Sequence, residues 1–229
     1  MSRPGQGRHP LPHSDVFAAQ LGRWGITPDS QVVVYDAADG SMAAARAWWM
    51  LRLMGHRHVA VLDGGLAAWR AAGLPETTAV PVPVDSGAYP GSFDADAVVD
   101  AEAILARLDA APGWLLDARA GERFRGEVEP IDPVAGHVPG AVSRPLGMSL
   151  RDGRFKPAAE LRAELGALLG DYAPEQAVVM CGSGVTACHL LLALEVAGLS
   201  GARVYAGSWS GWLQDRSRPV AVASQLQAQ

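Results

Sequence analysis

The sequence contains one pattern twice, and this internal repeat is the feature that most constrains the fold. Each copy opens with a short apolar run. It continues through a loop into a segment with helical character, and ends with a second apolar run, a glycine and a tryptophan. The first copy runs from Gln31 to Trp69 and the second from Gln176 to Trp212. Repeated strand–loop–helix units predict two related α/β domains, and the alternation of strands with helices favours a largely parallel sheet.

The two copies differ in what precedes them. An apolar run at Trp114–Asp117 and a turn at 136–140 come before the second copy, whereas only one helical segment, at 15–23, comes before the first. We therefore expect an incomplete first domain at residues 1–74, a proline-rich linker at 75–95 and a complete domain at 96–229. Either the natural start lies upstream of Met1, or the first domain is natively short and its sheet edge is covered by something else.

Local patterns place the expected helices and strands. Strands are expected at 32–35, 59–62, 114–117, 177–180 and 203–205. Helices are expected at 15–23, 42–54, 100–108, 157–169 and 187–197, and residues 119–139 read as a long polar loop.

Composition narrows the class of function. The 229 residues carry a formal net charge of -5, which gives no electrostatic footprint for nucleic acid or a membrane surface. No apolar run reaches the roughly 20 residues of a membrane span, and the first residues lack the apolar stretch of a secretory signal. Two cysteines favour a reducing, cytoplasmic location. We expect no metal and no cofactor, because neither Cys/His metal spacing nor a nucleotide-binding glycine motif is present.

The loop after the buried run of the second copy carries the strongest chemical signal. Backbone N–H groups between a strand and a helix have no intrahelical partner and, with the helix dipole, stabilise an anion. Such groups favour a thiolate and then a persulfide. We expect Cys181 to be a nucleophile in this cradle, and a buried, inert cysteine is the alternative. The small residues that follow it are Gly182, Ser183, Gly184, Val185 and Thr186.

Several motifs together resemble the rhodanese superfamily in its two-domain sulfurtransferase form. They are Asp117–Arg119, Arg123–Glu127, Gly136–Ala141, Cys181–Ala187 and Gly207–Trp209 in the second half, with Trp48–Trp49 and Leu62–Gly65 in the first. The resemblance implies an α/β fold of tandem rhodanese-like domains, each a mostly parallel sheet flanked by helices, with the first one incomplete. Asp36 stands where the second copy has Cys181, as expected of an inactive domain. The loop resembles the 3-mercaptopyruvate type, since it lacks the basic residues of the thiosulfate type.

This resemblance implies a sulfurtransferase. Cys181 takes sulfur from a small anionic donor, 3-mercaptopyruvate or thiosulfate, as a persulfide and passes it to a small thiol, thioredoxin or cyanide. Arg123 matches the family's first substrate-binding arginine, and residues 182–186 complete the expected binding site. The family's second substrate arginine falls near Ile131–Asp132, where this sequence has none. We therefore expect a clamp with one arginine, at which thiosulfate competes with mercaptopyruvate.

The same resemblance assigns a relay and leaves one other class of function open. Ser183 and His9 match two members of a Ser-His-Asp relay proposed for mercaptopyruvate enzymes, and the aspartate falls in the segment that the first copy lacks. A non-enzymatic module that binds a partner or carries sulfur is the alternative function, favoured by the incomplete first domain and disfavoured by the intact Cys181. A Cys-loop phosphatase is disfavoured because the arginine that closes its loop is replaced by Ala187 and Cys188.

Overall fold

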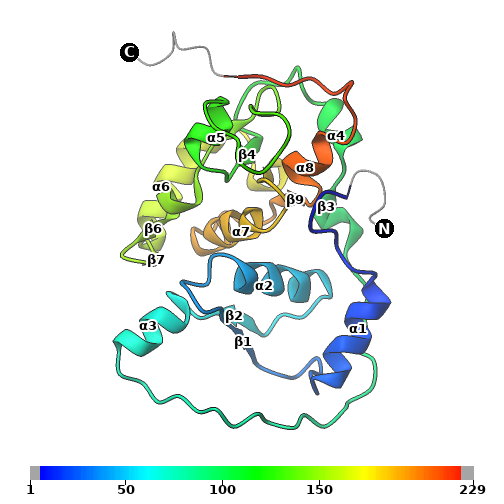
Figure 1. Ribbon diagram of the computed structural model, residues 1–229, viewed down its shortest axis with the longest axis vertical. Coiled ribbons are helices and arrows are strands. Elements are labelled where there is room, and N and C mark those ends of the chain that lie inside the picture. Colours follow the sequence, from blue (N-terminus) through cyan, green and yellow to red (C-terminus); the bar gives the residue numbers. More distant parts are fainter. Residues whose placement is uncertain (1–5, 223–229) are drawn as a thin grey trace. The chain divides into compact units, whose positions relative to one another are not determined.

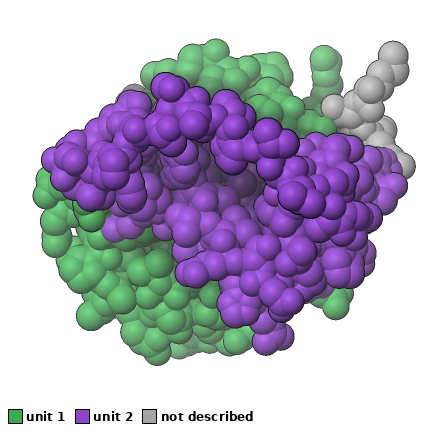
Figure 2. All heavy atoms as spheres, turned by 90° about the horizontal axis from the view of Figure 1, so that it is seen from below, with its two compact units in different colours: residues 1–10, 96–229 green, residues 11–95 purple. Residues whose placement is uncertain are grey.

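The computed structural model describes residues 6–222, and within it the chain forms two compact units (Figures 1 and 2). Unit 1 comprises Met1–Pro10 and Asp96–Gln229, and unit 2 comprises Leu11–Ala95. The N-terminal segment up to Pro10 therefore groups with the second half of the chain. Across the described residues, every helix is too short or too polar to cross a membrane.

Unit 1 is built on a parallel sheet of five short strands with the order β3-β9-β8-β4-β5. The strands are β3 (Val98–Val99), β4 (Leu115–Asp117), β5 (Val142–Ser143), β8 (Val178–Met180) and β9 (Arg203–Tyr205). The central strand β8 pairs with β4 through Leu115 opposite Val178, and its residues are buried. A parallel sheet of this kind is covered on both faces, which explains the unbroken apolar sequence of β8.

Helices connect these strands and cover the sheet (Figure 1). They are α4 (Ala101–Leu105), α5 (Gly121–Arg125), α6 (Ala158–Leu169), α7 (Thr186–Val196) and α8 (Ser208–Trp212). Short 3-10 turns lie at Ala95–Ala97, Leu146–Ser149 and Pro174–Gln176, and an antiparallel pair is formed by β6 (Leu150–Arg151) and β7 (Arg154–Phe155). The α7 residues 187–194 are all buried, as their apolar sequence requires.

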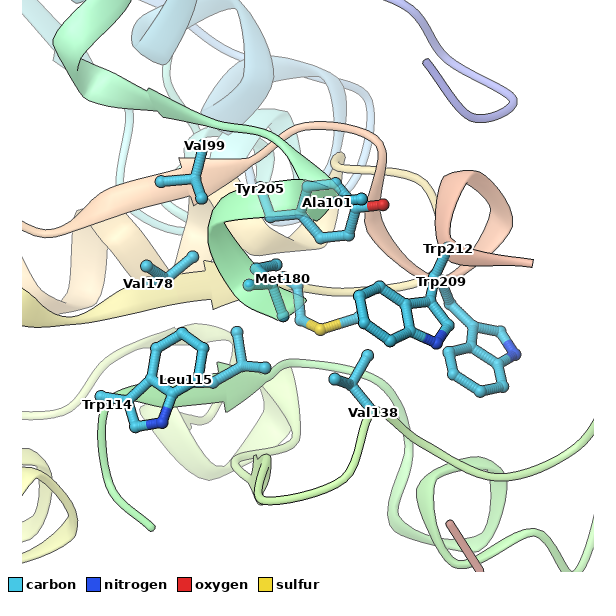
Figure 3. Close-up of a cluster of buried hydrophobic side chains, with 11 residues drawn as sticks. Val99, Ala101, Trp114, Leu115, Val138, Val178, Met180, Tyr205, Trp209 and Trp212 are labelled. Atoms are coloured by element: carbon cyan, nitrogen blue, oxygen red, sulfur yellow. The ribbon is translucent and has the colours of Figure 1, made fainter. Parts of the chain in front are cut away.

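The core of unit 1 gathers around the ends of β8 and β9 (Figure 3). Met180 ends β8 and Trp209 lies in α8, and both side chains are fully buried in this cluster. The other members are Val99, Ala101, Ile104, Trp114, Leu115, Val138, Val178, Tyr205 and Trp212. Burial of aromatic rings of this size contributes several kcal/mol in total, at about 25 cal/mol per Å² of apolar surface. The packing therefore fixes the two points of the chain from which the loop at Cys181 and helix α8 begin.

Unit 2 has a smaller frame. It contains α1 (Ser14–Arg23), β1 (Val32–Val34), α2 (Ala43–Leu53), β2 (Val59–Val61) and α3 (Gly65–Ala71), and β1 pairs with β2 in parallel. Val32 and Val34 face a core that contains Leu21 and Leu51. Val33 and Tyr35 point to the other face and are 53% and 59% exposed. The sheet of unit 2 therefore has an apolar face that its own helices leave open.

The predicted α/β class, with two repeated and mostly parallel units, is confirmed. Two local predictions are wrong. The helix expected at 100–108 ends at Leu105, because the bonds that follow tighten to the i→i+3 type. The loop expected at 119–139 contains α5. Sequence patterns also missed β3 and the β6–β7 pair, since two residues are too few to show a period.

Candidate active site

Cys181 lies at the carboxyl end of the central strand β8, in the loop that leads into α7. Ligand sites of open α/β sheets occupy this position. The thiol is buried, with the residue 2% exposed, and its Sγ accepts a hydrogen bond from the backbone N–H of Gly184 at 3.1 Å. Gly184 has a φ of 80°, which a residue with a side chain rarely adopts. The glycine therefore lets the loop turn an N–H group towards the sulfur.

Hydrogen bonds from helix α8 hold the backbone of this loop in place. The N–H of Cys181 donates to Ser208 Oγ at 3.0 Å, and this hydroxyl donates to the carbonyl of Tyr205 at 2.9 Å. The N–H of Trp209 donates to the carbonyl of Cys181, and that of Ser210 to the carbonyl of Gly182, both at 2.9 Å. These bonds leave the loop little freedom, so its N–H groups are oriented before any ligand arrives.

The N-terminal segment of unit 1 reaches the same loop. Gly7 has a φ of 70° and approaches the carbonyl of Gly207 so closely that a Cβ would clash with it. The N–H of Arg8 donates to Ser210 Oγ at 3.1 Å. The next residue, His9, has its Nδ1 2.8 Å from Ser183 Oγ. The structure therefore brings together the two side chains that the sequence assigned to a relay, although they are far apart in the chain.

Two arginines border the loop, where the sequence predicted one. A Cβ placed on Gly182 would lie 3.3 Å from Nη2 of Arg8 and 3.6 Å from both Nη atoms of Arg123. The structure therefore places a second guanidinium beside the loop, in addition to the one that was expected to hold the donor. Arg8 is the functional candidate that the sequence analysis missed. No local pattern could have found it, because contacts of Gly7 and Arg8 with α8 place it there.

Arg123 and Arg8 share one buried carboxylate. Arg123 Nη2 lies 3.1 Å from Asp132 Oδ2, and Arg8 Nη1 pairs with Asp132 Oδ1. Arg123 also binds Glu129 through Nη2 at 2.6 Å. The side chains of Asp132 and Glu129 are 2% and 4% exposed. The family resemblance placed a second arginine near Asp132. In the structure Asp132 instead binds Arg8, which comes from the N-terminal segment.

A further buried ion pair lies next to Glu129, the carboxylate that binds Arg123. Arg119 forms a buried ion pair with Asp117 at 2.7 Å and lies 3.6 Å from Glu129. Its guanidinium also stacks over the ring of Trp209, 4.7 Å from the ring centroid. The carboxylates and guanidiniums therefore alternate from Asp117 to Arg8. Removing Arg119 would leave the buried Asp117 with unpaired charge, which is the costly way to break such a network.

The hydrogen bonds that Glu129 accepts in this network lower its pKa. Burial by itself raises the pKa of Glu129, but the hydrogen bonds from Arg123 and from the backbone N–H groups of Asp132 and Ile131 outweigh it. The pKa therefore lies below the ordinary value of a glutamate. Glu129 stays ionised wherever the site is folded at neutral pH, and it keeps Arg123 oriented.

The loop at Asp36 in unit 2 shows what this loop type binds. Asp36 stands at the position that corresponds to Cys181 in the repeat. Its carboxylate accepts backbone N–H groups of the loop at 2.9 to 3.4 Å, those of Ala38, Gly40, Met42 and Ala44. The same strand–loop–helix design therefore holds an anion at its centre.

Within residues 6–222, no group of three or more His, Cys, Asp or Glu side chains is arranged to hold a metal ion. Both cysteines are free and buried, and Cys188 Sγ donates to the carbonyl of Gly184 at 3.2 Å. Cys188 is thus packed beneath the loop, as expected of a structural residue.

A model of the rhodanese-like domain matches residues 2–72 and 100–215. The chain belongs to the family of proteins with rhodanese-like domains, and the predicted family and tandem organisation are confirmed.

Named relatives narrow the class. A protein of Pseudomonas aeruginosa assigned as a 3-mercaptopyruvate sulfurtransferase is 51% identical over 94% of this chain and 76% of its own length. SseB of Mycobacterium tuberculosis, assigned as a thiosulfate sulfurtransferase, is 44% identical over 94% of this chain and 75% of its own length. The crystal structure of SseA from Escherichia coli, a 3-mercaptopyruvate sulfotransferase with the "Rhodanese" fold, superimposes with a TM-score of 0.70 and 32% identity over 92% of this chain and 80% of that one.

Proposed function

We propose that the chain is a sulfurtransferase that carries sulfur as a persulfide on Cys181. The observation that carries the proposal is the cradle itself: the Cys181 sulfur accepts the N–H of Gly184, and two arginines border the adjacent Gly182. A nucleophilic sulfur beside paired guanidiniums suits an anionic sulfur donor. The relatives assigned as sulfurtransferases support the same reaction.

In the first half-reaction the Cys181 thiolate attacks the donor's sulfur. With 3-mercaptopyruvate, a new S–S bond forms, the donor's C–S bond breaks, and pyruvate enolate leaves with the bonding electrons. The enolate then takes up a proton at carbon to give pyruvate. We assign delivery of this proton to the Ser183–His9 pair, whose Oγ and Nδ1 are 2.8 Å apart. With thiosulfate, the bond between the two sulfurs breaks and sulfite leaves instead.

In the second half-reaction an acceptor attacks the outer sulfur of the persulfide. The S–S bond to Cys181 breaks, the acceptor leaves as thiocyanate or as a persulfide, and the Cys181 thiolate is restored. Backbone N–H groups of residues 182–186 stabilise the negative charge that moves between the sulfurs. The acceptors we propose are a small thiol, thioredoxin or cyanide.

We propose 3-mercaptopyruvate as the preferred donor. Arg8 and Arg123 together can hold a carboxylate, which one arginine would hold more weakly. Asp132 and Glu129 lie against the same guanidiniums and cancel much of their positive charge. Because the two carboxylates offset the charge of the two guanidiniums, the site has little excess positive charge. Such a site favours the dianion thiosulfate less strongly over the monoanion mercaptopyruvate.

Catalysis is assigned to the domain at residues 96–229 together with Arg8 and His9, and the rest of the domain expected at 1–74 is assigned no chemistry. We also propose that residues 75–95 are the linker between the two domains. Two free cysteines support a cytoplasmic location, where thiols stay reduced.

The test is donor-dependent formation of thiocyanate from cyanide, with Cys181→Ala and Cys188→Ala compared in parallel. We expect Cys181→Ala to abolish turnover and Cys188→Ala to retain it, because both thiols are buried but only one lies in the cradle. Intact mass after donor exposure should rise by one sulfur atom in the wild-type chain. Equal turnover of wild type and Cys181→Ala would refute the enzyme and favour the non-enzymatic alternative. Turnover with thiosulfate alone would refute the donor preference.

A further inference from the structure

Ser208, the first residue of α8, has a backbone conformation that its residue type disfavours. Its φ is 51°, in the left-handed region, and the residue is fully buried. Among residues 6–222, Asp152 is the one other residue with a side chain that has a positive φ, and it lies in the exposed turn between β6 and β7. Strained positions of this kind persist only where the surrounding contacts enforce them, and they gather at functional sites.

The internal repeat supplies a direct comparison for this position. Gly65, the first residue of α3, lies four residues before Trp69, and Ser208 lies four residues before Trp212. Gly65 has a φ of 56°, so the two residues share one backbone conformation. Glycine adopts this conformation without strain. The first copy of the repeat thus uses the unstrained residue at this position, whereas the second copy uses serine.

The two copies fill the space next to this position differently. A Cβ placed on Gly65 would clash with the carbonyl oxygen of Ala38, so backbone occupies the place that a side chain would need. The loop between strand and helix spans residues 35–42 in the first copy and only residues 181–185 in the second. The shorter loop leaves room for the side chain of Ser208.

The hydroxyl group of Ser208 forms two buried hydrogen bonds. It donates its single proton to the carbonyl of Tyr205 at 2.9 Å, and its Oγ accepts the N–H of Cys181 at 3.0 Å. Met180 precedes Cys181 and Trp209 follows Ser208, and both are packed with Tyr205 in the same buried cluster (Figure 3). The N–H of Cys181 is therefore held from a fixed point.

We propose that Ser208 is a positioning residue for sulfur transfer and acts through the backbone of Cys181. The proposal rests on the function proposed above. By holding the N–H of Cys181, Ser208 fixes the direction of the Cα–Cβ bond and so keeps Sγ at the N–H of Gly184. Attack on the donor's sulfur depends on this alignment, because a small displacement of a reacting atom slows a reaction strongly. This role explains a strained serine where the first copy has glycine.

Ser208→Gly and Ser208→Ala separate the hydroxyl group from the strain. Both remove the hydrogen bond to Cys181, but only glycine also relieves the strained φ. Persulfide formation is followed by rapid quench and intact mass at several donor concentrations. We expect the maximal rate to fall about ten- to hundredfold in both variants, with little change in the donor concentration that gives half of it. Ser208→Ala should have the lower melting temperature, because it keeps the strain.

Ser217→Ala is the matched control, because it removes an exposed hydroxyl group that binds Asp215 in the same unit. We expect it to keep the wild-type rate. Hydrogen exchange gives a readout that does not depend on turnover. Exchange at residues 178–184 should become at least about threefold faster in both Ser208 variants and stay unchanged in the control.

The outcomes separate this proposal from the proposed function. The positioning role is overturned if the wild-type chain is active and either Ser208 variant forms persulfide at the wild-type rate, since the hydroxyl group is then dispensable. It is also overturned if exchange at 178–184 is unchanged in both variants. A wild-type chain that forms no persulfide with either donor would refute the proposed function, and the positioning role with it.

Discussion

Arg8 offers the sharpest test of the active-site geometry. Replacing it with alanine removes one of the two guanidiniums beside Gly182 and leaves Asp132 paired with Arg123. A hydrogen bond to a charged group contributes about 1.5–3 kcal/mol. The Arg8 side chain is 34% exposed, so solvent screening puts its contribution at the lower end, about 1.5 kcal/mol. We therefore expect kcat/KM for mercaptopyruvate to fall about tenfold, at 1.36 kcal/mol per factor of ten.

The assay compares Arg8→Ala with Arg125→Ala in initial-rate measurements. Arg125 is the matched control, because it is 48% exposed and paired with Glu127 at the surface of the helix that carries Arg123. Loss of an interaction made equally with substrate and transition state raises KM and leaves kcat nearly unchanged, and this is the change we expect in Arg8→Ala. Thermal unfolding of both variants checks that the fold is intact. If the two variants have the same kcat/KM, Arg8 does not hold the donor and the two-arginine site is wrong.

Three further predictions concern the same site. Asp132→Asn removes one negative charge beside the guanidiniums, so kcat/KM should rise for thiosulfate by about three- to tenfold and for mercaptopyruvate by less; equal changes for both donors in steady-state assays would contradict the charge argument. Gly184→Ala forces a side chain into a backbone conformation that costs about 1–2 kcal/mol, and it displaces the N–H that donates to Cys181. We expect less persulfide by intact mass after a fixed donor exposure, and full persulfide formation would show that this N–H is dispensable. Because the pKa of Glu129 is lowered in the folded state, its stabilising effect is present above the unfolded value and is lost as pH falls through the folded one. Glu129→Gln should thus lower the melting temperature at pH 7 and approach wild type in acid, and a pH-independent difference would count against the ion pair with Arg123.

The loop at Cys181 could be predicted from sequence because everything that defines it is local. A buried run, one cysteine, small residues and an apolar helix follow one another without interruption. Arg123 lies on the short helix α5, in a motif that could also be read locally. The repeat added Asp36 as the counterpart of Cys181, so the sequence alone predicted that one of the two loops carries a nucleophile and the other does not.

The position of Arg8 could not be predicted, because it depends on contacts between distant parts of the chain. Gly7 must lie against Gly207, and the Arg8 backbone must bind Ser210, before the guanidinium reaches Asp132. Each of these contacts joins residues about 200 positions apart, or more than 100 for the ion pair, and no periodicity reports them. The family resemblance placed a second arginine near Ile131–Asp132, and in the structure the guanidinium of Arg8 reaches Asp132 from the other end of the chain.

The two loops of the repeat differ in whether their anion can leave. The carboxylate of Asp36 is part of the chain, and it accepts four backbone N–H groups of its own loop. At Cys181 the corresponding charge is exchangeable, since it arrives with the donor's sulfur and departs with the acceptor. One architecture thus serves as a structural cap where the anion is resident and as a site of turnover where it is transient. The difference between the two rests on the chemistry of a single side chain.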